Sequence, residues 1–419
     1  MATIDKAITI EEQMELEVRD RSKDMELEVE VDVTEEDADF DNFEQLEDGN
    51  IAFGMPTPPL EETDFYDNLA DALDNGDLAS IKNDLMGSID SDKESRSDWE
   101  KTYREGLEYL GMKYEERSQP FEGASGVMHP LLAESVTQFQ AQAYNELLPS
   151  QGPVKTQVIG MTTPETEQQA SRVQEFMNYQ LMQVMREYDS ETDQMLFYLP
   201  LSGSAFRKVY YDQNLGRAVS KFIPSEDLIV PYGATDLHSA TRITHVINMS
   251  MNEIRKLQQI GFYRDVDLDY GNVTPNEMDE IQEEIDSIQG VEPGYDNNDM
   301  CQVYESHVEL DIEGFEDMNA EGEETGIKLP YIVTIANGKV LSIRRNYKED
   351  DQLKQRINYF VHYKFLPGLG FYGFGLTHMI GGLSKASTSI LRQLIDAGTL
   401  SNLPAGFKAR GIRIRNDDQ

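Results

Sequence analysis

Three features of the sequence predict an α+β fold. Apolar residues at helical spacing dominate from residue 63 to residue 202. Short β-type runs separated by turn signals dominate from residue 203 to residue 366. A long helical pattern returns near the C-terminus, and a chain of 419 residues has room for more than one domain.

These changes in pattern divide the chain into five segments. We expect an acidic arm with a Pro-rich linker, a helical region, a strand-rich region, a Gly-rich hinge with a long helix, and a basic tail. The boundaries of these segments are 1–62, 63–202, 203–366, 367–402 and 403–419.

The arm is the most acidic part of the chain. Residues 1–50 carry 19 Asp and Glu against 4 Lys and Arg, a net charge of −15. Met25–Val33 alternates apolar and acidic residues, which is the period of a strand, but such a density of like charge opposes a folded sheet. We expect disorder here, with an arm that docks on a partner as the alternative.

Composition excludes several classes of protein. The net charge of −42 argues against ordinary nucleic-acid binding, which needs a basic surface to hold phosphates. Cys301 is the only cysteine, so neither a disulfide within the chain nor a thiolate zinc site is expected. The N-terminus lacks the features of a signal peptide, and no run of 18 apolar residues predicts a membrane span.

Four helices are expected in the helical region. The first begins near Thr63, and Ser97 with Asp98 is expected to cap the second. The third has Pro130 in its first turn, and the fourth runs from Pro164 to Tyr188. The residues expected to face inward on the fourth helix are Val173, Phe176, Met177, Leu181, Val184 and Met185.

The strand-rich region contains eight β-type runs. Turn residues at 212–216 and at Asn337-Gly338 predict two hairpins, and Ser250 with Glu253 forms a capping box that opens a short helix. A further helix is expected at Glu277–Ile288. The predicted strands cover residues 205–211, 218–223, 228–230, 243–247, 302–311, 331–336, 340–345 and 359–365.

The longest helical pattern runs from Leu376 to Leu400, after the Gly-rich hinge. Its apolar positions predict one face, and small or hydroxylated residues predict another. Periodicity alone favours a core helix, and the alternative is a helix that packs beside copies of itself. The apolar residues are Leu376, Met379, Ile380, Leu383, Ile390, Leu391, Leu394 and Ile395. The small face consists of Ser384, Ala386, Ser387 and Ser389.

Motifs for catalysis and cofactor binding are missing from the sequence. It contains no phosphate loop, no H-E-x-x-H pair and no G-x-S-x-G elbow. The acidic run at Asp265, Asp267 and Asp269 lacks the glycine and the bidentate acid of a calcium loop. We therefore expect no enzyme, no cofactor and no metal, and a metal-dependent hydrolase is the weakest hypothesis.

Three stretches resemble a known family, the portal proteins of tailed double-stranded DNA phages, especially the short-tailed type. They are PFEGASGVMHPLLAESVTQFQAQAYNELLP (120–149), IPSEDLIVP (223–231), and PGLGFYGFGL with IGGLSKASTSILRQLIDAGTLSNLPAGFKARG (367–411). The resemblance covers roughly residues 65–419 as a whole pattern. It implies a portal-type subunit in which residues 63–366 form a wing, the long helix a stem, and residues 403–419 the start of a clip.

The resemblance also implies a non-enzymatic function and a set of partners. Such proteins form a ring of about twelve copies at one capsid vertex, in the virion, after assembly in the host cytoplasm. Double-stranded DNA is packaged and ejected through the ring, which docks the terminase large subunit, a capsid or scaffold protein and a tail adaptor. The alternative is a virion scaffold or internal interaction protein that works through its acidic arm.

The basic residues near the C-terminus are the candidate contacts to DNA or partners. Their alternative role is to pair with carboxylates of a neighbouring copy. The candidates are Lys385, Arg392, Lys408, Arg410, Arg413 and Arg415. Family chains continue through a second stem helix and a crown, whereas this sequence stops at Gln419. We therefore expect a fragment or a split gene.

Overall fold

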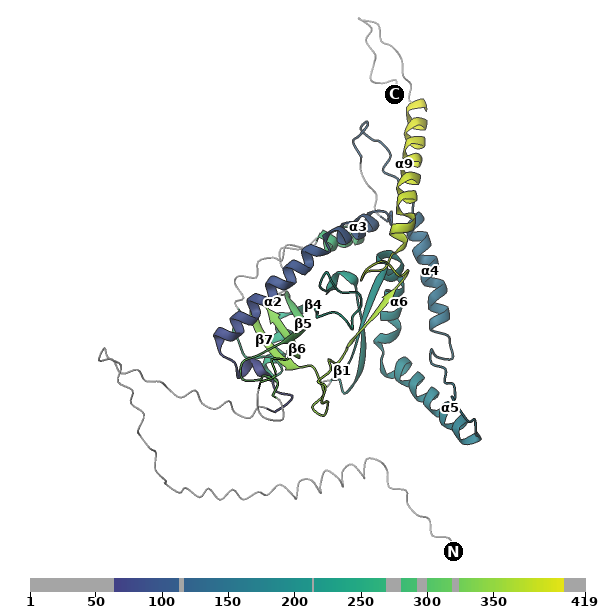
Figure 1. The fold of residues 1–419 in the computed structure, drawn as a ribbon. Coiled ribbons are helices and arrows are strands. Elements are labelled where there is room, and N and C mark those ends of the chain that lie inside the picture. Colours follow the sequence, from purple (N-terminus) through teal and green to yellow (C-terminus); the bar gives the residue numbers. More distant parts are fainter. Residues whose placement is uncertain are drawn as a thin grey trace, which may run out of the picture. The chain divides into compact units, whose positions relative to one another are not determined.

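The fold mixes helices with two antiparallel sheets, which is consistent with the expected α+β class (Figure 1). The predicted acidic arm and basic tail lie outside the part of the chain that the structure describes. This structure is a computed structural model. It describes residues 64–112, 117–212, 215–268, 280–291, 300–318 and 324–402.

The helices fall mainly before residue 203 and after residue 375. In chain order they are η1 (Leu69–Asp71), α2 (Asn75–Ser95), α3 (Ser97–Glu108), α4 (Leu131–Leu147), α5 (Pro164–Tyr179), the π-helical turn η2 (Gln180–Val184), α6 (Glu187–Ser202), η3 (Ser225–Asp227), α7 (Met251–Gln259), α8 (Glu280–Gln289) and α9 (Leu376–Asn402).

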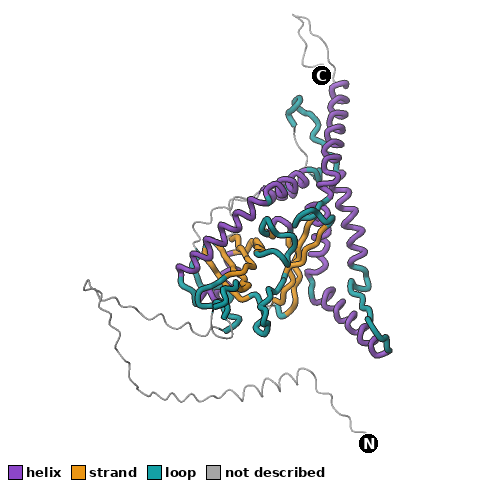
Figure 2. The backbone as a smooth tube through the Cα atoms, viewed as in Figure 1, coloured by secondary structure: helices purple, strands orange, loops and turns teal. Residues whose placement is uncertain are grey.

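The strands, orange in Figure 2, form two sheets. The strand orders are β2-β1-β8 and β3-β4-β5-β6-β7. All the neighbouring strands in both sheets are antiparallel. Each predicted β-type run contains or overlaps an observed strand. The strands are β1 (Ser204–Asp212), β2 (Arg217–Ile223), β3 (Leu228–Ile229), β4 (Arg242–Ser250), β5 (Met300–Leu310), β6 (Leu329–Ala336), β7 (Lys339–Arg345) and β8 (Phe360–Lys364).

Both predicted hairpins are confirmed. Asp212 pairs with Arg217 across the first hairpin. Asn337 and Gly338 connect β6 to β7 with φ angles of 46° and 68°, the left-handed conformation that a tight two-residue turn requires. The capping box of Ser250 and Glu253 is also present at the start of α7.

The five-stranded sheet has α2 on one face (Figure 1). Because side chains alternate across a strand, Val333 and Ile335 of β6 face the helix, where they pack with Leu85 and Ile89. Asn68 closes the free edge of β7: its side chain donates to the carbonyl of Leu341 and accepts from the Ile343 amide. The N-terminal end of the described chain is thereby fixed to the sheet.

The three-stranded sheet lies between α6 and the five-stranded sheet (Figure 1). Lys208 of β1 reaches Glu305 of β5 at 2.5 and 2.7 Å, and His307 reaches the same carboxylate at 2.9 Å. Burial alone would raise the pKa of Glu305, but Lys208 and His307 hold it well below its usual range. This charged contact joins the two sheets.

The expected helix from Pro164 to Tyr188 is wrong in extent. It divides into α5 and η2, and the chain bends at Met185 before α6 begins at Glu187. The sequence pattern did not predict α6, because most of its apolar residues lie in its second half and Pro200 lies near its end. Its buried side chains nevertheless recur at helical spacing, at Thr192, Met195, Leu196 and Leu199.

Two expected helix starts differ in detail. The N-cap of α3 is Arg96, with no side-chain cap, so Ser97 and Asp98 lie inside the helix. Only Arg96 separates α2 from α3. The non-helical backbone of this one residue, without a side-chain cap, forms the boundary between the two helices. Pro130 is the N-cap of α4, one position earlier than expected. The helix start near Thr63 lies outside the described residues.

Candidate functional site

The long C-terminal helix α9 is attached to the rest of the chain through a narrow face of small and hydroxylated residues. Its buried side chains are Thr377, Gly381, Ser384 and Thr388, which are spaced four and three apart. The Thr377 hydroxyl donates to the carbonyl of Leu201 at 2.9 Å. Larger residues would hold α9 away from its support, so this face permits a close approach.

The contact of α9 with α3 depends on a glycine. A Cβ added at Gly106 would lie 2.5 Å from the hydroxyl oxygen of Thr377, so α3 can approach α9 only because residue 106 lacks a side chain. Around this contact the first turns of α9 pack on α3, α4 and α6, and α8 packs on α3. The cluster comprises Tyr103, Leu107, Leu110, Leu132, Ala133, Val136, Leu201 and Ile281, with Leu376 and Ile380 of α9 against it.

A second support follows α9 further along. We name residues 125–129 the strap. The amide of His129 donates to the Thr388 hydroxyl at 3.0 Å, and the amide of Ser125 donates to Asp396 at 2.7 Å. Between them, Arg392 donates from Nε to the carbonyl of Val127 at 2.8 Å. These three α9 residues are four apart, so the strap lies along one side of the helix.

The opposite side of α9 is apolar and uncovered in this chain. Met379, Leu383, Ile390 and Leu394 are 57%, 62%, 65% and 69% exposed. With two exposed alanines they recur at spacings of four and three, the pattern of a helix that packs along another helix. We name this surface the α9 stripe; it consists of Met379, Leu383, Ala386, Ile390, Leu394 and Ala397.

The structure corrects the expected use of the two faces. Ser384, a residue of the predicted small face, is buried, and its hydroxyl lies 3.5 Å from the carbonyl oxygens of Tyr109 and His129 in the same chain. The eight apolar residues do not form one core face, since Leu376 and Ile380 join the cluster whereas the stripe residues are exposed. A core helix is therefore wrong for most of α9 in the single chain.

The predicted hinge before α9 is a place of close backbone contact. We name residues 366–375, with residues 200–204 that they cross, the joint. A methyl group added at Gly373 would overlap the carbonyl oxygen of Gly203, and one at Gly375 would lie 2.5 Å from that of Leu201. Gly203 also has a φ of 85°. Glycine at these positions is explained by packing and by backbone conformation.

Polar contacts complete the joint. The Gly373 amide donates to the Ser204 hydroxyl at 2.8 Å, and that hydroxyl lies 3.1 Å from Nε2 of His362. Because Ser204 accepts from Gly373, its own proton is free to point at His362, which must then be neutral at Nε2. Burial lowers the pKa of His362 to about 3, in keeping with this arrangement.

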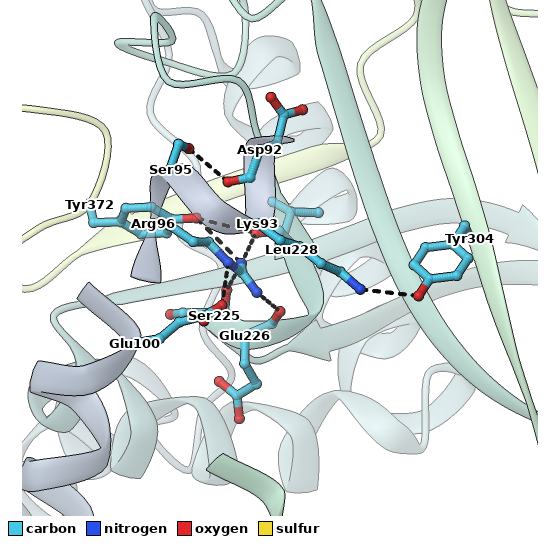
Figure 3. A network of polar contacts seen from close by, with 10 residues as sticks. All are labelled: Asp92, Lys93, Ser95, Arg96, Glu100, Ser225, Glu226, Leu228, Tyr304 and Tyr372. Atoms are coloured by element: carbon cyan, nitrogen blue, oxygen red, sulfur yellow. Dashed lines mark hydrogen bonds and ion pairs between the residues drawn. The ribbon is translucent and has the colours of Figure 1, made fainter. Parts of the chain in front are cut away.

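Arg96 lies beside Tyr372 of the joint and contacts several polar groups there (Figure 3). Its guanidinium donates to the carbonyl groups of Ser225, Glu226 and Leu228 at 3.2, 2.6 and 3.0 Å. It also contacts the carboxylate of Glu100 at 2.6 Å. One buried side chain therefore connects the α2–α3 break to the segment that enters β3.

Tyr372 places the joint against this arginine. Its hydroxyl lies 3.5 Å from Nη1 of Arg96 (Figure 3). Its ring stacks on Trp99, with the ring centroids 4.5 Å apart. Burial raises the pKa of the Tyr372 hydroxyl, so the residue stays neutral. Neither Arg96 nor Trp99 was singled out for function in the sequence, because only the tertiary structure brings them to the joint.

Two of the six basic candidates lie in the described part of the chain. Lys385 is exposed on α9, with its ammonium 5.6 Å from the ring centroid of Tyr109, and a hydrogen bond with Tyr109 raises its pKa. Arg392 is engaged by the strap, as described above. The other four lie outside the described residues and are not brought together with them. They are Lys408, Arg410, Arg413 and Arg415.

Among the described residues, no group of three or more His, Cys, Asp or Glu side chains could hold a metal ion. The sheet histidines have structural surroundings: His307 contacts Glu305 and Asn346, and His245 packs edge-on to Phe360. Within the same residues, no helix is both long enough and apolar enough to cross a membrane.

Residues 207–411 match the family model described as the phage SU10 portal protein. The match begins in β1 and continues beyond the end of α9, so it includes most of both sheets, the joint except residues 200–204, and the α9 stripe. It supports a phage portal protein. The short-tailed type and a C-terminal truncation stay predictions. No curated protein matches the chain.

Proposed function

We propose that this chain is the subunit of a phage portal, a ring at one capsid vertex through which double-stranded DNA is packaged and later ejected. The family match over residues 207–411 supports this role. The observation that carries the proposal is the α9 stripe, which leaves large apolar side chains uncovered in a single chain. Exposed apolar surfaces of this kind mark sites of association.

The charge of α9 favours another copy as the occupant. Only Lys385, Arg392 and Asp396 are charged among its 27 residues, whereas 27% of the whole chain is charged. Two copies with a net charge of −42 each repel wherever their acidic surfaces meet. The stripe lets α9 helices lie side by side around a ring, with small residues directed to the rest of each subunit.

The same charge suits a channel for DNA. A ring multiplies the acidity of each subunit, so phosphates are repelled at short range and DNA slides without adhering. In this proposal Lys385 and the basic tail residues contact DNA, the terminase large subunit, a capsid or scaffold protein, or a tail adaptor, and Arg392 holds the strap. Portal proteins are structural, and we propose no catalytic residue and no cofactor. The protein would reside in the virion after assembly in the host cytoplasm.

The experiment compares the purified full chain with the variant Leu383→Asp/Leu394→Asp. Electron microscopy and light scattering should give closed rings for the unchanged chain and smaller species for the variant. Both substituted side chains are exposed, so the midpoint of thermal unfolding of the subunit should change by less than about 2 °C. The matched control is Ser389→Asp/Thr399→Asp, which adds the same two negative charges at exposed positions of α9 outside the stripe.

A strictly monomeric full chain at every concentration would contradict the proposal. So would rings that form equally well in the stripe variant. A deletion of residues 1–62 separates the proposal from the alternative of a scaffold that acts through its arm: rings should survive this deletion in a portal subunit.

A further inference from the structure

Exposed apolar side chains concentrate on two helices of this chain. Of the 33 large apolar residues that are exposed in the described part, seven fall within residues 159–182 and six within residues 379–400. The second group includes the α9 stripe. The first group lies on α5, the segment before it and η2, outside the region of the family match. This concentration needs its own explanation.

Helix α5 is attached to the chain through polar groups. Asn178 pairs with both backbone groups of Val154, accepting from its amide at 2.9 Å and donating to its carbonyl at 3.1 Å. One turn earlier, Gln174 accepts from the Thr156 amide at 3.3 Å, and the Thr156 hydroxyl donates to the Ala170 carbonyl at 2.9 Å. The attached side of α5 therefore contains Ala170, Gln174 and Asn178, spaced four apart.

The free side of α5 is the apolar one. Val173, Phe176 and Met177, which the sequence predicts to be inward-facing, are 53%, 59% and 41% exposed, and α5 has no buried residue. That prediction is wrong for the single chain. These three residues follow the i, i+3, i+4 spacing of one helix face, which we name the α5 face. The apolar pattern is a true helix face, but the described part of the chain leaves it exposed.

The α5 face is also uncharged. By helical periodicity the polar residues in line with it are Thr166, Gln169 and Gln180. Arg172, four residues before Phe176, lies at its edge, whereas Glu167 and Glu175 lie on other sides of the helix. For a chain with a net charge of −42, contact between two copies through most surfaces places acid against acid. The α5 face, like the α9 stripe, avoids this repulsion. A partner of the same composition therefore suits it.

We infer that the α5 face is a second contact surface between neighbouring copies of this chain. The inference rests on the proposed function, because a ring closes by head-to-tail contacts, and such contacts use two different surfaces of each subunit. The α9 stripe joins the helices of adjacent subunits. The α5 face packs on the body of the next subunit and excludes water from Phe176, the largest side chain of the face.

Site-specific alkylation of the full chain tests this directly. The only natural cysteine, Cys301, is buried, so an introduced thiol is the reactive one. We compare Phe176→Cys with Glu175→Cys, one residue away on a different side of α5. In assembled protein the alkylation rate at residue 176 should fall about tenfold relative to unassembled protein, whereas the rate at residue 175 should change less than about twofold. Circular dichroism confirms that each variant folds.

The outcomes separate the inference from the proposed function. If rings form and residue 176 reacts as fast as residue 175, the α5 face is not a contact between copies and the inference is overturned, whereas the portal proposal stands. If the unchanged chain forms no assembly, the portal proposal fails and the inference fails with it. As an independent arm, Phe176→Glu should lower the yield of assembled protein at unchanged thermal stability, and normal assembly of this variant would overturn the inference.

Discussion

The joint and the outer half of α9 are neighbours in the chain but have opposite surroundings. In the joint, backbone contacts backbone at Gly203 and Gly373, and polar groups such as the Ser204 hydroxyl have partners. On the outer half of α9, Ile390 and Leu394 are more than half exposed. The strap contacts this half on another side, at Arg392 and Asp396. The groups of the joint are therefore packed and hydrogen-bonded within the chain, whereas the apolar side chains on the outer half of α9 are exposed.

This difference shows how a helix can be held firmly while its apolar side stays available. The chain attaches α9 with small and hydroxylated residues, which permit close contact and hydrogen bonds. The large apolar residues are thereby left for a partner. The same division recurs on α5, which is attached through Ala170, Gln174 and Asn178. In both helices the large apolar side chains of one face are exposed in the described part of the single chain, and such faces mark sites of association.

The substitution with the largest expected effect tests whether the joint is closely packed, in contrast to the outer half of α9. Gly373→Ala places a methyl group against the carbonyl oxygens of Gly203 and Leu366. Because backbone on both sides must move, we expect a loss of about 4 kcal/mol in the free energy of unfolding. Urea unfolding followed by circular dichroism measures it. The control is Gly370→Ala in the same segment, where a methyl meets open space and the cost should stay below about 1 kcal/mol. Equal stability of the two variants would show that the joint is not closely packed.

A slightly smaller effect is expected at Arg96, which supplies the polar contacts beside the joint. Arg96→Met leaves the carbonyl groups of Ser225, Glu226 and Leu228 without their donor. Since buried acceptors without partners are destabilising, the free energy of unfolding should fall by about 3 kcal/mol. Lys101→Met, an exposed change on α3, should alter it by less than about 0.5 kcal/mol. Calorimetry of both variants makes the comparison, and a neutral Arg96→Met would mean that the network does not stabilise the joint.

The smallest effect concerns pH. The pKa of His362 is lowered to about 3 in the folded protein, so between pH 6.5 and pH 3 the unfolded state binds the additional proton. The contribution of His362 to the free energy of unfolding is therefore fully present above about pH 6.5 and is lost as the pH falls toward 3. His362→Gln keeps an acceptor for Ser204 but does not titrate, so between pH 6 and pH 4 it should lose about 2 kcal/mol less stability than the unchanged chain. The exposed His238→Gln is the control of equal size. Parallel pH profiles for His362→Gln and the unchanged chain would refute this assignment.

Local patterns were sufficient for most of the strands and turns. The pair Asn337-Gly338 predicts its hairpin because both residues adopt positive φ at low cost, and Ser250 with Glu253 caps α7 through contacts three residues apart. The α6 helix was missed because local composition favours no helix at its start, while burial of Met195 and Leu199 against the three-stranded sheet stabilises it. Tertiary packing decided that element.

The candidate site was only half predictable. The sequence locates α9 and the glycines before it, and the resemblance to phage portal proteins follows from those stretches. Which face of α9 is attached could not be read from periodicity, since both an apolar and a small face recur at helical spacing. The roles of Arg96 and Trp99 were also out of reach, because their partners at residues 225–228 and 372 are distant in the sequence.

The sequence by itself determined the class of the fold, the order of its strands and turns, the position of the long helix and the acidity of the chain. These depend on composition and on contacts between near neighbours, which a sequence contains directly. Only the tertiary structure decided that glycines and hydroxyl groups hold α9 while its apolar side stays exposed. The reason is physical: a helix face is buried by whatever element approaches it most closely, and at Gly106, Gly373 and Gly375 the missing side chains set that approach.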